Sequence, residues 1–283
     1  MFINSHTKLL GIIGMPLSHS LSPMMHNQAL QNLKLDYAYI PLEFEEYNLS
    51  KAIDAIKVFN IRGVNVTIPY KEAVIPYLDE LTDSAYNCKA VNLIINNNGY
   101  LKGYNTDGEG FMLGIKEHDI ELKDNAVFIG AGGAARSIAY ELAHEVSRID
   151  FLDLDRQRAV ELADFITNKT DCDSNGYLML EELFVDLTLK ADIIINCSPV
   201  GMYPKVDISP VSCIKHLAKE TVLCDLIYNP LETKLLQMGK EHGLKVINGL
   251  PMFLYQGALS FEYMTGHSAP LKIMREVVTN QIK

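Results

Sequence analysis

The sequence has few cysteines, and they form no pattern that would indicate a disulfide framework or a zinc site. The five are widely separated and never stand as C-x-x-C; they are Cys88, Cys172, Cys197, Cys213 and Cys224. Disulfide-rich domains and zinc ribbons carry cysteines at short, repeated spacings. We therefore interpret the five as buried or neutral thiols. The histidines, among them His19, His26 and His267, also lack ligand spacing, so no metal is expected.

Long apolar runs and basic runs are missing as well. No segment approaches the roughly 20 apolar residues that cross a membrane, and the first 20 residues hold only a short apolar stretch broken by Gly and Pro. We therefore expect a cytoplasmic protein with no membrane partner. The net charge of -10 and the pI near 5.3 would repel phosphate backbones, and no run of Lys or Arg compensates locally. We therefore expect no nucleic-acid partner.

What the sequence does have is the composition of an ordinary globular protein. Apolar residues make up 48% and charged residues 21%, which allows burial sufficient to offset chain entropy. The 283 residues exceed the usual size of a single core. One large or two modest domains are therefore expected, and we take two as the prediction. Internal repeats and low-complexity tracts are missing.

The first third alternates short apolar runs with amphipathic segments. Apolar runs stand at 9–14, 37–42 and 63–68, and helical patterns begin near Pro23 and Glu46. This alternation is typical of βαβ units, so it predicts a mostly parallel sheet. The sequence Asn-Asn-Asn-Gly at 96–99 predicts a tight hairpin turn.

A second series of the same kind begins at residue 126. The strand AVFIG is followed by a glycine-rich turn, a helix to about His144, the strand RIDFLDL, another helix and the strand ADIIIN. The later strands VLCDLI and LKVIN continue the series, and two helices are predicted from about Leu250 to Thr265 and from Pro270 onward. This order predicts a doubly wound Rossmann domain that begins near Thr106. The fold class is therefore α/β with two domains.

The glycine-rich turn has the spacing of a dinucleotide site. Gly130, Gly132 and Ala135 form G-x-G-x-x-A between a predicted strand and a predicted helix. Gly130 would permit the tight turn, Gly132 would let the backbone approach a pyrophosphate, and Ala135 would bring the helix close to the sheet. A glycine turn without a ligand is the alternative, and the strand, the helix and the acidic residue beyond them favour the dinucleotide.

That acidic residue is Asp153, at the end of the next predicted strand. A carboxylate there accepts hydrogen bonds from the adenosine ribose hydroxyls and repels a 2′-phosphate, so it favours NAD over NADP. Enzymes that use NADP often place Arg immediately beyond this strand, where this chain has Leu154. Arg156 and Arg158 could turn toward a phosphate, or could simply be solvated at the start of a helix.

Four polar segments of the first domain follow predicted strand ends. They are residues 18–23, 65–72, 90–92 and 103–108. In open α/β sheets ligands bind beyond the strand ends, so hydroxyls, amides, a Lys and an Asp gathered there indicate a polyhydroxylated substrate.

Several residues in these segments also have a plainer interpretation. Ser20 and Ser22 precede Pro23 and could hold a carboxylate, but taken alone they favour an ordinary helix N-cap, which Ser22 would satisfy. Lys71 could be a solvated lysine that begins a helix. Asp107 could cap the helix expected near residue 108.

Taken together, the motifs resemble one family. The segments that carry the resemblance, in family order and over nearly the whole chain, are GMPLSHSLSP, GVNVTIPYKE, KAVN, GYNTDGEGF, GAGGAAR, NCSPVGM, DLIYNPLET and NGLPMFLYQGA. They closely resemble shikimate dehydrogenases. The resemblance implies a discontinuous substrate-binding domain (1–105 with 251–283) and a Rossmann NAD(P)-binding domain (106–250). It also implies reversible reduction of 3-dehydroshikimate to shikimate, a step of the shikimate pathway of aromatic amino acid biosynthesis.

The resemblance assigns roles by position. It makes Lys71 and Asp107 the catalytic pair. It assigns the substrate carboxylate to Ser20, Ser22 and Tyr228, and the ring hydroxyls to Thr67, Asn92, Asp107 and Gln256. It assigns the cofactor to Gly130, Ala131, Gly132, Gly133, Ala134 and Asp153, with Gly249 and Met252 at the nicotinamide end, although Met252 could equally be core packing. A positioned Lys beside a carboxylate can supply the proton that accompanies hydride transfer.

One segment departs from the family's commoner pattern. NADPH-using biosynthetic members carry an Asn-Arg-Thr type of segment where this chain has Asp153, Leu154 and Asp155. In this respect the chain is similar to NAD-using quinate/shikimate dehydrogenases, which also oxidise quinate. Ser22 retains the hydroxyl common in shikimate-binding members, whereas some quinate-preferring relatives have Thr there.

We therefore expect an enzyme that uses NAD, with NADP possible, on a small cyclitol carboxylate, as a monomer or homodimer. The alternatives are an NADPH-specific biosynthetic shikimate dehydrogenase, a different Rossmann dehydrogenase, and a dinucleotide-binding protein without catalysis. The presence of both Lys71 and Asp107 argues against the last.

Overall fold

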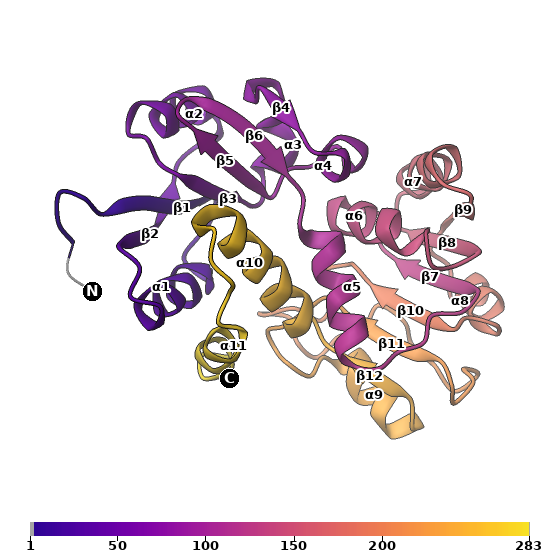
Figure 1. The fold of residues 1–283 in the computed structure, drawn as a ribbon. Coiled ribbons are helices and arrows are strands. Elements are labelled where there is room, and N and C mark those ends of the chain that lie inside the picture. Colours follow the sequence, from indigo (N-terminus) through magenta and orange to yellow (C-terminus); the bar gives the residue numbers. More distant parts are fainter. Residues whose placement is uncertain (1–2, 283) are drawn as a thin grey trace. The chain divides into compact units, whose positions relative to one another are not determined.

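The computed structural model describes residues 3–282, which form two compact α/β units (Figure 1). The first unit comprises the described residues up to Thr106 together with Leu254–Gln281, and the second comprises Asp107–Phe253. The prediction of a two-domain α/β fold is confirmed. The predicted division fell after residues 105 and 250, whereas the units divide after Thr106 and Phe253. The second division falls inside a continuous helix, α10 (Leu250–Thr265), where periodicity marks no break.

The first unit is built on a six-stranded sheet in the described part of the chain, ordered β2-β1-β3-β5-β6-β4. Its strands are β1 (Lys8–Gly14), β2 (Tyr37–Glu43), β3 (Gly63–Val66), β4 (Glu80–Leu81), β5 (Leu93–Asn97) and β6 (Tyr100–Tyr104). β5 runs antiparallel to both of its neighbours, and the other pairings are parallel. The mostly parallel sheet that the sequence predicts is therefore present.

The predicted hairpin joins β5 to β6. Asn98 and Gly99 have φ of 54° and 94°, the left-handed conformation that a two-residue hairpin loop requires. Asn97 pairs with Tyr100, and the Asn96 side-chain oxygen accepts a hydrogen bond from the Gly99 N–H at 2.7 Å. The Asn-Gly pair thus sets the register of both strands.

Helices pack on this sheet from both ends of the chain. They are α1 (Ser22–Asn32), α2 (Leu49–Val58), α3 (Tyr70–Ala73), α4 (Asp83–Cys88), α11 (Leu271–Thr279) and the part of α10 from Leu254, with short 3-10 turns η1 (Glu46–Asn48) and η2 (Ile75–Tyr77). α1 and α11, at opposite ends of the sequence, pack together. The resemblance implied this return of the chain, which periodicity could not show.

The second unit has a fully parallel sheet, ordered β12-β11-β10-β7-β8-β9 over the described residues. Its strands are β7 (Asn125–Ile129), β8 (Arg148–Asp153), β9 (Asp173–Leu178), β10 (Ile193–Asn196), β11 (Val222–Asp225) and β12 (Lys245–Ile247). This is the doubly wound order, with the topological switch between β7 and β10. The predicted Rossmann architecture is therefore present.

β9 was not predicted, and its sequence explains why. DSNGYL is polar and holds a glycine, so it lacks the apolar run of a buried strand. It lies at the edge of the sheet. A Cβ on Gly176 would stand 2.2 Å from the backbone carbon of Ala159, so glycine is what lets the strand lie against α7 (Arg156–Lys169). Tertiary packing, and not local preference, makes this segment a strand.

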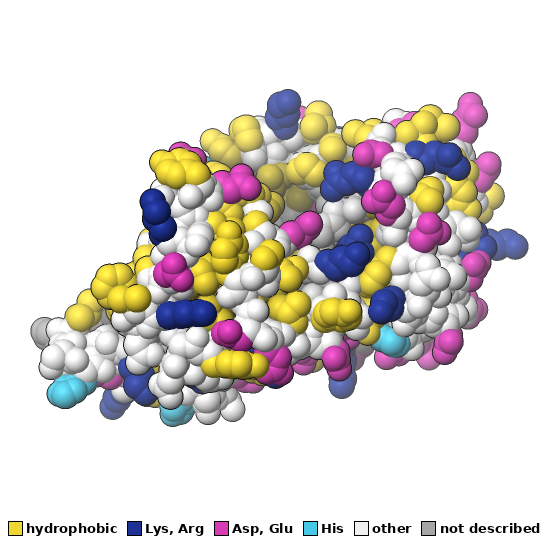
Figure 2. All heavy atoms as spheres, turned by 90° about the horizontal axis from the view of Figure 1, so that it is seen from above, with side chains coloured by type: hydrophobic (Ala, Val, Ile, Leu, Met, Phe, Trp, Pro, Cys, Tyr) yellow, Lys and Arg dark blue, Asp and Glu magenta, His cyan; other side chains and the backbone are white. Residues whose placement is uncertain are grey.

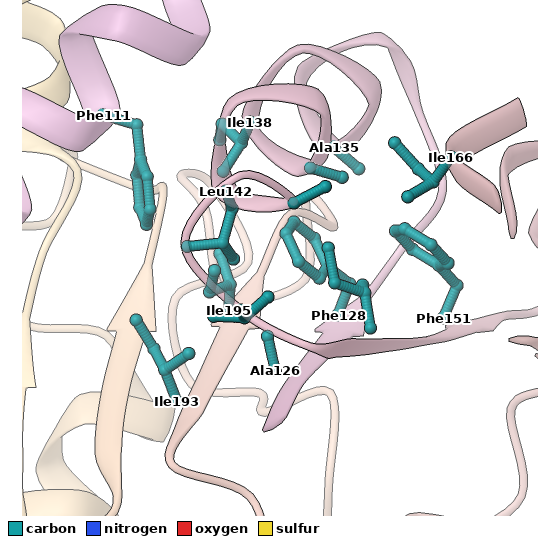
Figure 3. Close-up of a cluster of buried hydrophobic side chains, with 14 of the residues drawn as sticks. Phe111, Ala126, Phe128, Ala135, Ile138, Leu142, Phe151, Ile166, Ile193 and Ile195 are labelled. Carbon is teal, nitrogen blue, oxygen red and sulfur yellow. The ribbon is translucent and has the colours of Figure 1, made fainter. Parts of the chain in front are cut away.

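The remaining helices of the second unit cover its sheet. They are α5 (Asp107–Glu117), α6 (Gly133–Leu142), α7, α8 (Glu181–Thr188), α9 (Lys234–His242) and the first turn of α10. Phe128 and Phe151, on neighbouring strands, pack with ring centroids 5.1 Å apart beneath α6, which carries Ala135 and Ile138 (Figure 3). Ala135 is fully buried in this cluster, so the small side chain lets α6 approach the sheet as its motif predicts.

On the face of the molecule in Figure 2, Lys and Arg side chains are interspersed with Asp and Glu side chains. None of the helices between residues 3 and 282 combines the length and apolarity that a membrane crossing needs. All five cysteines are free thiols; Cys88, Cys172 and Cys224 are buried, whereas Cys213 is exposed.

The core of the first unit holds a buried histidine. His26 is 1% exposed and stacks on Tyr39 with ring centroids 4.4 Å apart. Within the described residues its Nδ1 atom has no hydrogen-bond partner. Burial lowers the pKa of His26 from 6.5 to about 3, because the charged ring would lose its hydration.

We expect this histidine to make the protein less stable as pH falls. Below pH 6.5 the unfolded chain takes up a proton that the folded chain binds only near pH 3, so stability falls through this window. From pH 7 to pH 5 the loss from His26 should be about 2 kcal/mol. His26→Phe, which keeps an aromatic ring beside Tyr39, should remove this part of the pH dependence in denaturant unfolding. His6→Phe, at an exposed position, should keep it; an unchanged slope in His26→Phe would refute the assignment.

Candidate active site

Four predicted site residues lie at one edge of the first unit's sheet. β1 and β3 are parallel and end together, and the Thr67 N–H donates to the Ile13 carbonyl at 2.9 Å. β5 runs the opposite way and therefore begins at the same edge, where the Val66 N–H donates to the Asn92 carbonyl at 2.8 Å. The segments that carry Ser20, Thr67, Lys71 and Asn92 thus meet beyond these strand ends. The sequence pattern predicts this gathering.

The two serines precede and open α1. Leu21 occupies the N-cap position, and Ser22 is the first helical residue. The Ser20 Oγ accepts a hydrogen bond from the Ser22 N–H at 3.4 Å. The interpretation of Ser22 as the N-cap is therefore wrong: Pro23 suits the first turn, so the helix begins one residue earlier than a capping serine would require.

Thr67 sits tightly against the end of β1. A Cβ on Gly14 would stand 2.3 Å from the Thr67 Cγ2 methyl, so a side chain at position 14 would displace the threonine. The Thr67 carbonyl accepts from the Tyr70 N–H at 2.9 Å, which turns the chain into α3. The position of Thr67 is therefore determined by packing on one side and by the turn on the other.

Lys71 is the second residue of α3 and is half-buried. Its carbonyl accepts from the Val91 N–H at 2.8 Å, which ties α3 to the residue before Asn92. Lys71 does lie in the first turn of a helix, as the alternative interpretation expects, but it is half-buried and not fully solvated.

A buried hydrogen-bond network surrounds Asn92 in the first unit. The Asn92 Oδ1 accepts from the Thr106 N–H at 2.9 Å, and its Nδ2 donates to the Thr106 hydroxyl at 2.9 Å. The Thr106 hydroxyl donates to the Gln256 carbonyl at 3.1 Å. Asn92 and Thr106 are 2% and 1% exposed, and Gln256 is half-buried. The network brings together two predicted ligands through a residue that the sequence did not single out.

Asp107 opens the second unit and is joined directly to Thr106. It is the first residue of α5 and is 5% exposed. A carboxylate in the first turn is stabilised by the helix dipole. The capping alternative placed Asp107 just before the helix, whereas here it lies in the first turn. A Cβ on Gly108 would stand 2.3 Å from the Ser137 carbonyl oxygen, so glycine lets this turn pack against α6.

The glycine-rich turn has the geometry of a phosphate-binding loop. Gly130 has φ of 98°, and a Cβ there would stand 3.1 Å from the Ser198 nitrogen. Gly132 is the N-cap of α6, so the N–H groups of the first helical turn are available to an anion. No heavy atom of the described residues lies within 4 Å of a Cβ built on Gly133. The turn therefore leaves open space at the start of α6.

Asp153 stands beside this turn. Its Oδ2 accepts from the Ala131 N–H at 2.7 Å, and its Oδ1 accepts from the Asp155 N–H at 2.9 Å. Leu154 is 82% exposed, and Asp155 caps α7 by accepting from the Gln157 N–H at 3.0 Å. A carboxylate with two oxygens can keep these bonds and still accept from ribose hydroxyls.

The two arginines at the start of α7 are both exposed, and they differ in how close they come to the glycine-rich turn. The Arg158 Nη2 lies 3.9 Å from the position of a Cβ on Gly132, so its guanidinium is beside the glycine-rich turn. Arg156 opens the helix. Of the two, Arg158 is the cation placed to meet a phosphate at this turn.

The sequence reasoning missed a buried carboxylate at the end of β11. The Asp225 Oδ1 accepts from Asn196 Nδ2 at 3.0 Å and from the Ile227 N–H at 3.1 Å, and its Oδ2 accepts from the Thr233 hydroxyl at 2.7 Å. Burial raises the pKa of Asp225 to about 6, against the effect of these hydrogen bonds. The Asn196 side chain also accepts from Ser198, which lies against Gly130. The signal available was the acidic residue at a strand end within DLIYNP.

Three predicted residues of the second unit have clear packing roles. Tyr228 stacks on Phe253 with centroids 4.7 Å apart, and burial raises its pKa. Met252 packs against the core and lines a cavity of about 10 Å³, large enough for about one water. A Cβ on Gly249 would stand 1.9 Å from the Leu226 carbonyl oxygen. Met252 therefore packs against the hydrophobic core, as the alternative interpretation of this residue expects.

The described residues hold no group of three or more His, Cys, Asp or Glu side chains that could bind a metal ion. The polar groups gathered at these two regions are hydroxyls, amides, one lysine, carboxylates and the N–H groups of the glycine-rich turn.

Comparison with protein-family models finds two matches. Residues 12–94 match the shikimate dehydrogenase substrate binding domain, and residues 249–279 match the shikimate 5'-dehydrogenase C-terminal domain. Both matches include segments of the first unit.

Comparison with curated proteins and solved structures covers the whole chain. A shikimate dehydrogenase (NADP(+)) of Syntrophomonas wolfei is 51% identical over 100% of this chain and 98% of its own length. A shikimate 5-dehydrogenase from Listeria monocytogenes, solved with shikimate and NAD, is 34% identical with a TM-score of 0.92, covering 98% of each chain. A quinate dehydrogenase from Corynebacterium glutamicum, solved with NAD, is 31% identical with a TM-score of 0.89, covering 97% of this chain and 99% of that one.

Proposed function

Because this chain belongs to the shikimate dehydrogenase family and is an NAD(P)-dependent oxidoreductase acting on a CH–OH group, we propose that it interconverts shikimate and 3-dehydroshikimate with NAD favoured. The observation that carries the cofactor preference is the Asp153 carboxylate, held beside the glycine-rich turn by the Ala131 N–H. The substrate assignment is supported by the family and by the polar residues gathered at the strand ends of the first unit.

In this proposal the first unit supplies most of the substrate contacts. Ser20 and Ser22 bind the carboxylate at the start of α1, where a helix N-terminus favours an anion. Thr67, Asn92 and Gln256 bind ring hydroxyls, since threonine and amide side chains both donate and accept. Tyr228 and Asp107, from the second unit, complete the set by analogy with the family.

Lys71 and Asp107 form the proposed catalytic pair. A nicotinamide dinucleotide, when bound, would supply the hydride chemistry at the ring carbon. Lys71 takes the proton from the hydroxyl oxygen, or returns it in the reverse direction, and Asp107 orients the ammonium group. The Lys71 ammonium group also stabilises negative charge that develops on the substrate oxygen as its bond to the ring carbon changes order.

The residues of the second unit fit a dinucleotide. The open space over Gly133, the N–H groups of α6 and the carboxylate of Asp153 match the pyrophosphate and the adenosine ribose. The nicotinamide would lie toward Gly249 and Met252. These residues bind and orient the cofactor, which brings the hydride chemistry.

Two features bear on the choice between NAD and NADP. Asp153 would repel a 2′-phosphate, and exposed Leu154 offers it no hydrogen bond. Arg158 stands near the turn and could bind that phosphate, and the relative from Syntrophomonas wolfei is named for NADP(+). Since the carboxylate lies at the strand end itself, we propose that its repulsion outweighs the attraction of an exposed arginine.

Quinate is a second candidate substrate. The likeness to the quinate dehydrogenase solved with NAD supports it, together with the acidic strand end that favours NAD. Quinate differs from shikimate by an extra hydroxyl on the carboxylate-bearing carbon, so both acids could use Ser20 and Ser22.

The test is a steady-state assay of reduced-cofactor absorbance, with shikimate or quinate crossed against NAD or NADP. We expect shikimate oxidation with a higher kcat/KM for NAD than for NADP. A preference for NADP would overturn the assigned effect of Asp153 and point to Arg158 as the phosphate ligand. Cofactor binding without oxidation of either acid would favour a non-catalytic dinucleotide-binding protein.

The same assay on Asp153→Asn isolates the carboxylate charge. We expect the KM for NAD to rise about tenfold or more, because a charge-assisted hydrogen bond to ribose is weakened, and the KM for NADP to fall. The KM for shikimate should stay unchanged. Asp155→Asn is the matched control, since Asp155 caps α7 and can still do so as asparagine.

A further inference from the structure

Asp225 is a buried carboxylate on which hydrogen bonds from three segments of the second unit converge. It is the last residue of β11 and is 1% exposed. Its Oδ1 atom accepts from the Asn196 side chain at 3.0 Å and from the Ile227 N–H at 3.1 Å, and its Oδ2 atom accepts from the Thr233 hydroxyl at 2.7 Å. Thr233 is the N-cap of α9. One side chain therefore joins the ends of β10 and β11 to the start of α9.

The first connection from Asp225 leads to the glycine-rich turn. An ionised carboxylate can only accept hydrogen bonds, so the Asn196 amide turns its nitrogen toward Asp225 and its oxygen away. That oxygen accepts from the Ser198 N–H at 3.0 Å and from the Ser198 hydroxyl at 2.7 Å. A Cβ on Gly130 would stand 3.1 Å from the Ser198 nitrogen and 3.2 Å from the Cys197 carbonyl carbon. The orientation of the Asn196 amide therefore determines where this backbone meets the turn.

The second connection leads to the other end of the proposed cofactor site. The Ile227 N–H donates to Asp225, and the Ile227 carbonyl accepts from the Gly249 N–H at 3.0 Å. A Cβ on Gly249 would stand 1.9 Å from the Leu226 carbonyl oxygen, so these two backbones are in contact. Asp225 and Met252 also line the same cavity of about 10 Å³. Asp225 is thus connected to both residues proposed for the nicotinamide end.

We propose that Asp225 is a positioning residue for the cofactor, which holds the glycine-rich turn and the Gly249 segment at the spacing that a dinucleotide needs. It acts through Asn196 and Ile227, because its own side chain is buried and its oxygens are engaged by protein donors. A buried network in which every bond is made resists rearrangement. The inference rests on the proposed function, which assigns Gly130 and Gly249 to the cofactor.

The charge of Asp225 sets the strength of both connections. Burial raises the pKa of Asp225 to about 6, against the effect of its hydrogen bonds. Above pH 6 the carboxylate is charged and its bonds are charge-assisted, whereas below pH 6 it is neutral and the same bonds are weaker. This difference gives the positioning role a pH dependence that can be measured.

The other titratable groups around Asp225 do not change charge in this range. The Cys197 and Cys224 thiols have their pKa raised by loss of hydration and then by the Asp225 charge, so both stay neutral. Apart from Cys224, the residues that line the cavity with Asp225 do not titrate. α9 begins with Lys234, which is exposed and stays charged.

The first test removes one connection and keeps the other. Asn196→Ala leaves the Thr233 and Ile227 bonds to Asp225 in place but releases Ser198. We expect the Kd for NADH or NADPH, whichever the parent binds more tightly, to rise about tenfold in a fluorescence titration. The KM for shikimate should stay within about twofold of the parent. An Asn196→Ala protein that binds the reduced cofactor like the parent would overturn the proposal.

The second test changes the charge and keeps the bonds. In Asp225→Asn the side-chain oxygen can accept from Asn196 and Ile227, and its nitrogen can donate to the Thr233 hydroxyl, so this variant should fold. From pH 7.5 to pH 5 the Kd for the reduced cofactor should rise about threefold more in the parent than in Asp225→Asn, which is neutral throughout.

Asp192→Asn is the matched control for this pH profile. Asp192 precedes β10 at the opposite edge of the sheet and accepts from the Asp124 and Asn125 N–H groups at 3.0 and 2.9 Å. Its profile should follow that of the parent. Identical profiles in the parent, Asp192→Asn and Asp225→Asn would refute the positioning role, since a structural role alone would not titrate with cofactor binding.

Cofactor binding and turnover together separate this inference from the proposed function. Weaker cofactor binding in Asn196→Ala, in a protein whose parent does not oxidise shikimate, would uphold the positioning role and refute the proposed reaction. Unchanged cofactor binding in Asn196→Ala, beside shikimate oxidation by the parent, would refute the positioning role and leave the proposed reaction in place.

Discussion

Lys71→Ala is expected to lower kcat for shikimate oxidation by about 10²–10⁴-fold, the usual contribution of a positioned general acid or base. The side chain starts from a half-buried turn of α3, tied to the strand-end edge by the Val91 N–H. Without it, the Lys71 amine can no longer take up the proton and its cation no longer stabilises the alkoxide. Steady-state assays at saturating shikimate and NAD measure the loss.

Two controls sharpen this test. Lys51→Ala removes an exposed lysine of α2 and should leave kcat unchanged. NADH binding to Lys71→Ala, followed by fluorescence, should equal that of the parent, since Lys71 lies outside the dinucleotide-binding unit. If Lys71 and Asp107 act as a unit, adding Asp107→Asn to Lys71→Ala should cause little further loss. Normal turnover in Lys71→Ala would remove Lys71 from the chemistry.

Gly249→Ala is expected to destabilise the second unit by about 3 kcal/mol or more, or to prevent its folding. The added methyl carbon would stand 1.9 Å from the Leu226 carbonyl oxygen and 2.4 Å from its carbon, where only backbone movement can make room. The Gly249 N–H donates to the Ile227 carbonyl at 3.0 Å, so such movement would also break the connection to the segment that carries Tyr228.

Urea unfolding followed by circular dichroism measures this loss. Gly133→Ala is the matched control, because no heavy atom of the described residues lies within 4 Å of the added Cβ and alanine suits a helix. It should unfold like the parent. A stable Gly249→Ala protein with weakened NAD binding would instead place this glycine in the cofactor site, as the family resemblance predicts.

The fold could be predicted where the signal is local. Alternating apolar runs and helical patterns indicated the two α/β domains, and the Asn-Gly pair at 98–99 indicated the hairpin, because each depends on neighbouring residues. β9 was missed because it becomes a strand only through Gly176 and its fit against α7. The alternative interpretation of Ser22 as an N-cap was wrong by one position, since helix ends are the least specific part of the pattern.

In the candidate site, too, the features with a local sequence signal could be predicted, and those that depend on tertiary contacts could not. Residue types and motif order identified the glycine-rich turn, Asp153 and the strand-end polar residues. Asp225 was missed, although it joins β10 and β11 through Asn196, because a lone acidic residue in an apolar strand carries no sequence signal of its partners. The roles assigned to individual site residues stay predictions until the variants above are measured.

The sequence by itself determined the fold class, the family and the dinucleotide motif, since these depend on residue type, spacing and order along the chain. Only the tertiary structure decided how the polar groups are oriented. The Ala131 N–H donates to Asp153, and Thr106 bonds both to the Asn92 amide and to the carbonyl of Gln256, 150 residues further along the chain. The physical reason is that hydrogen bonds depend on distance and direction between atoms that the folded chain alone brings together.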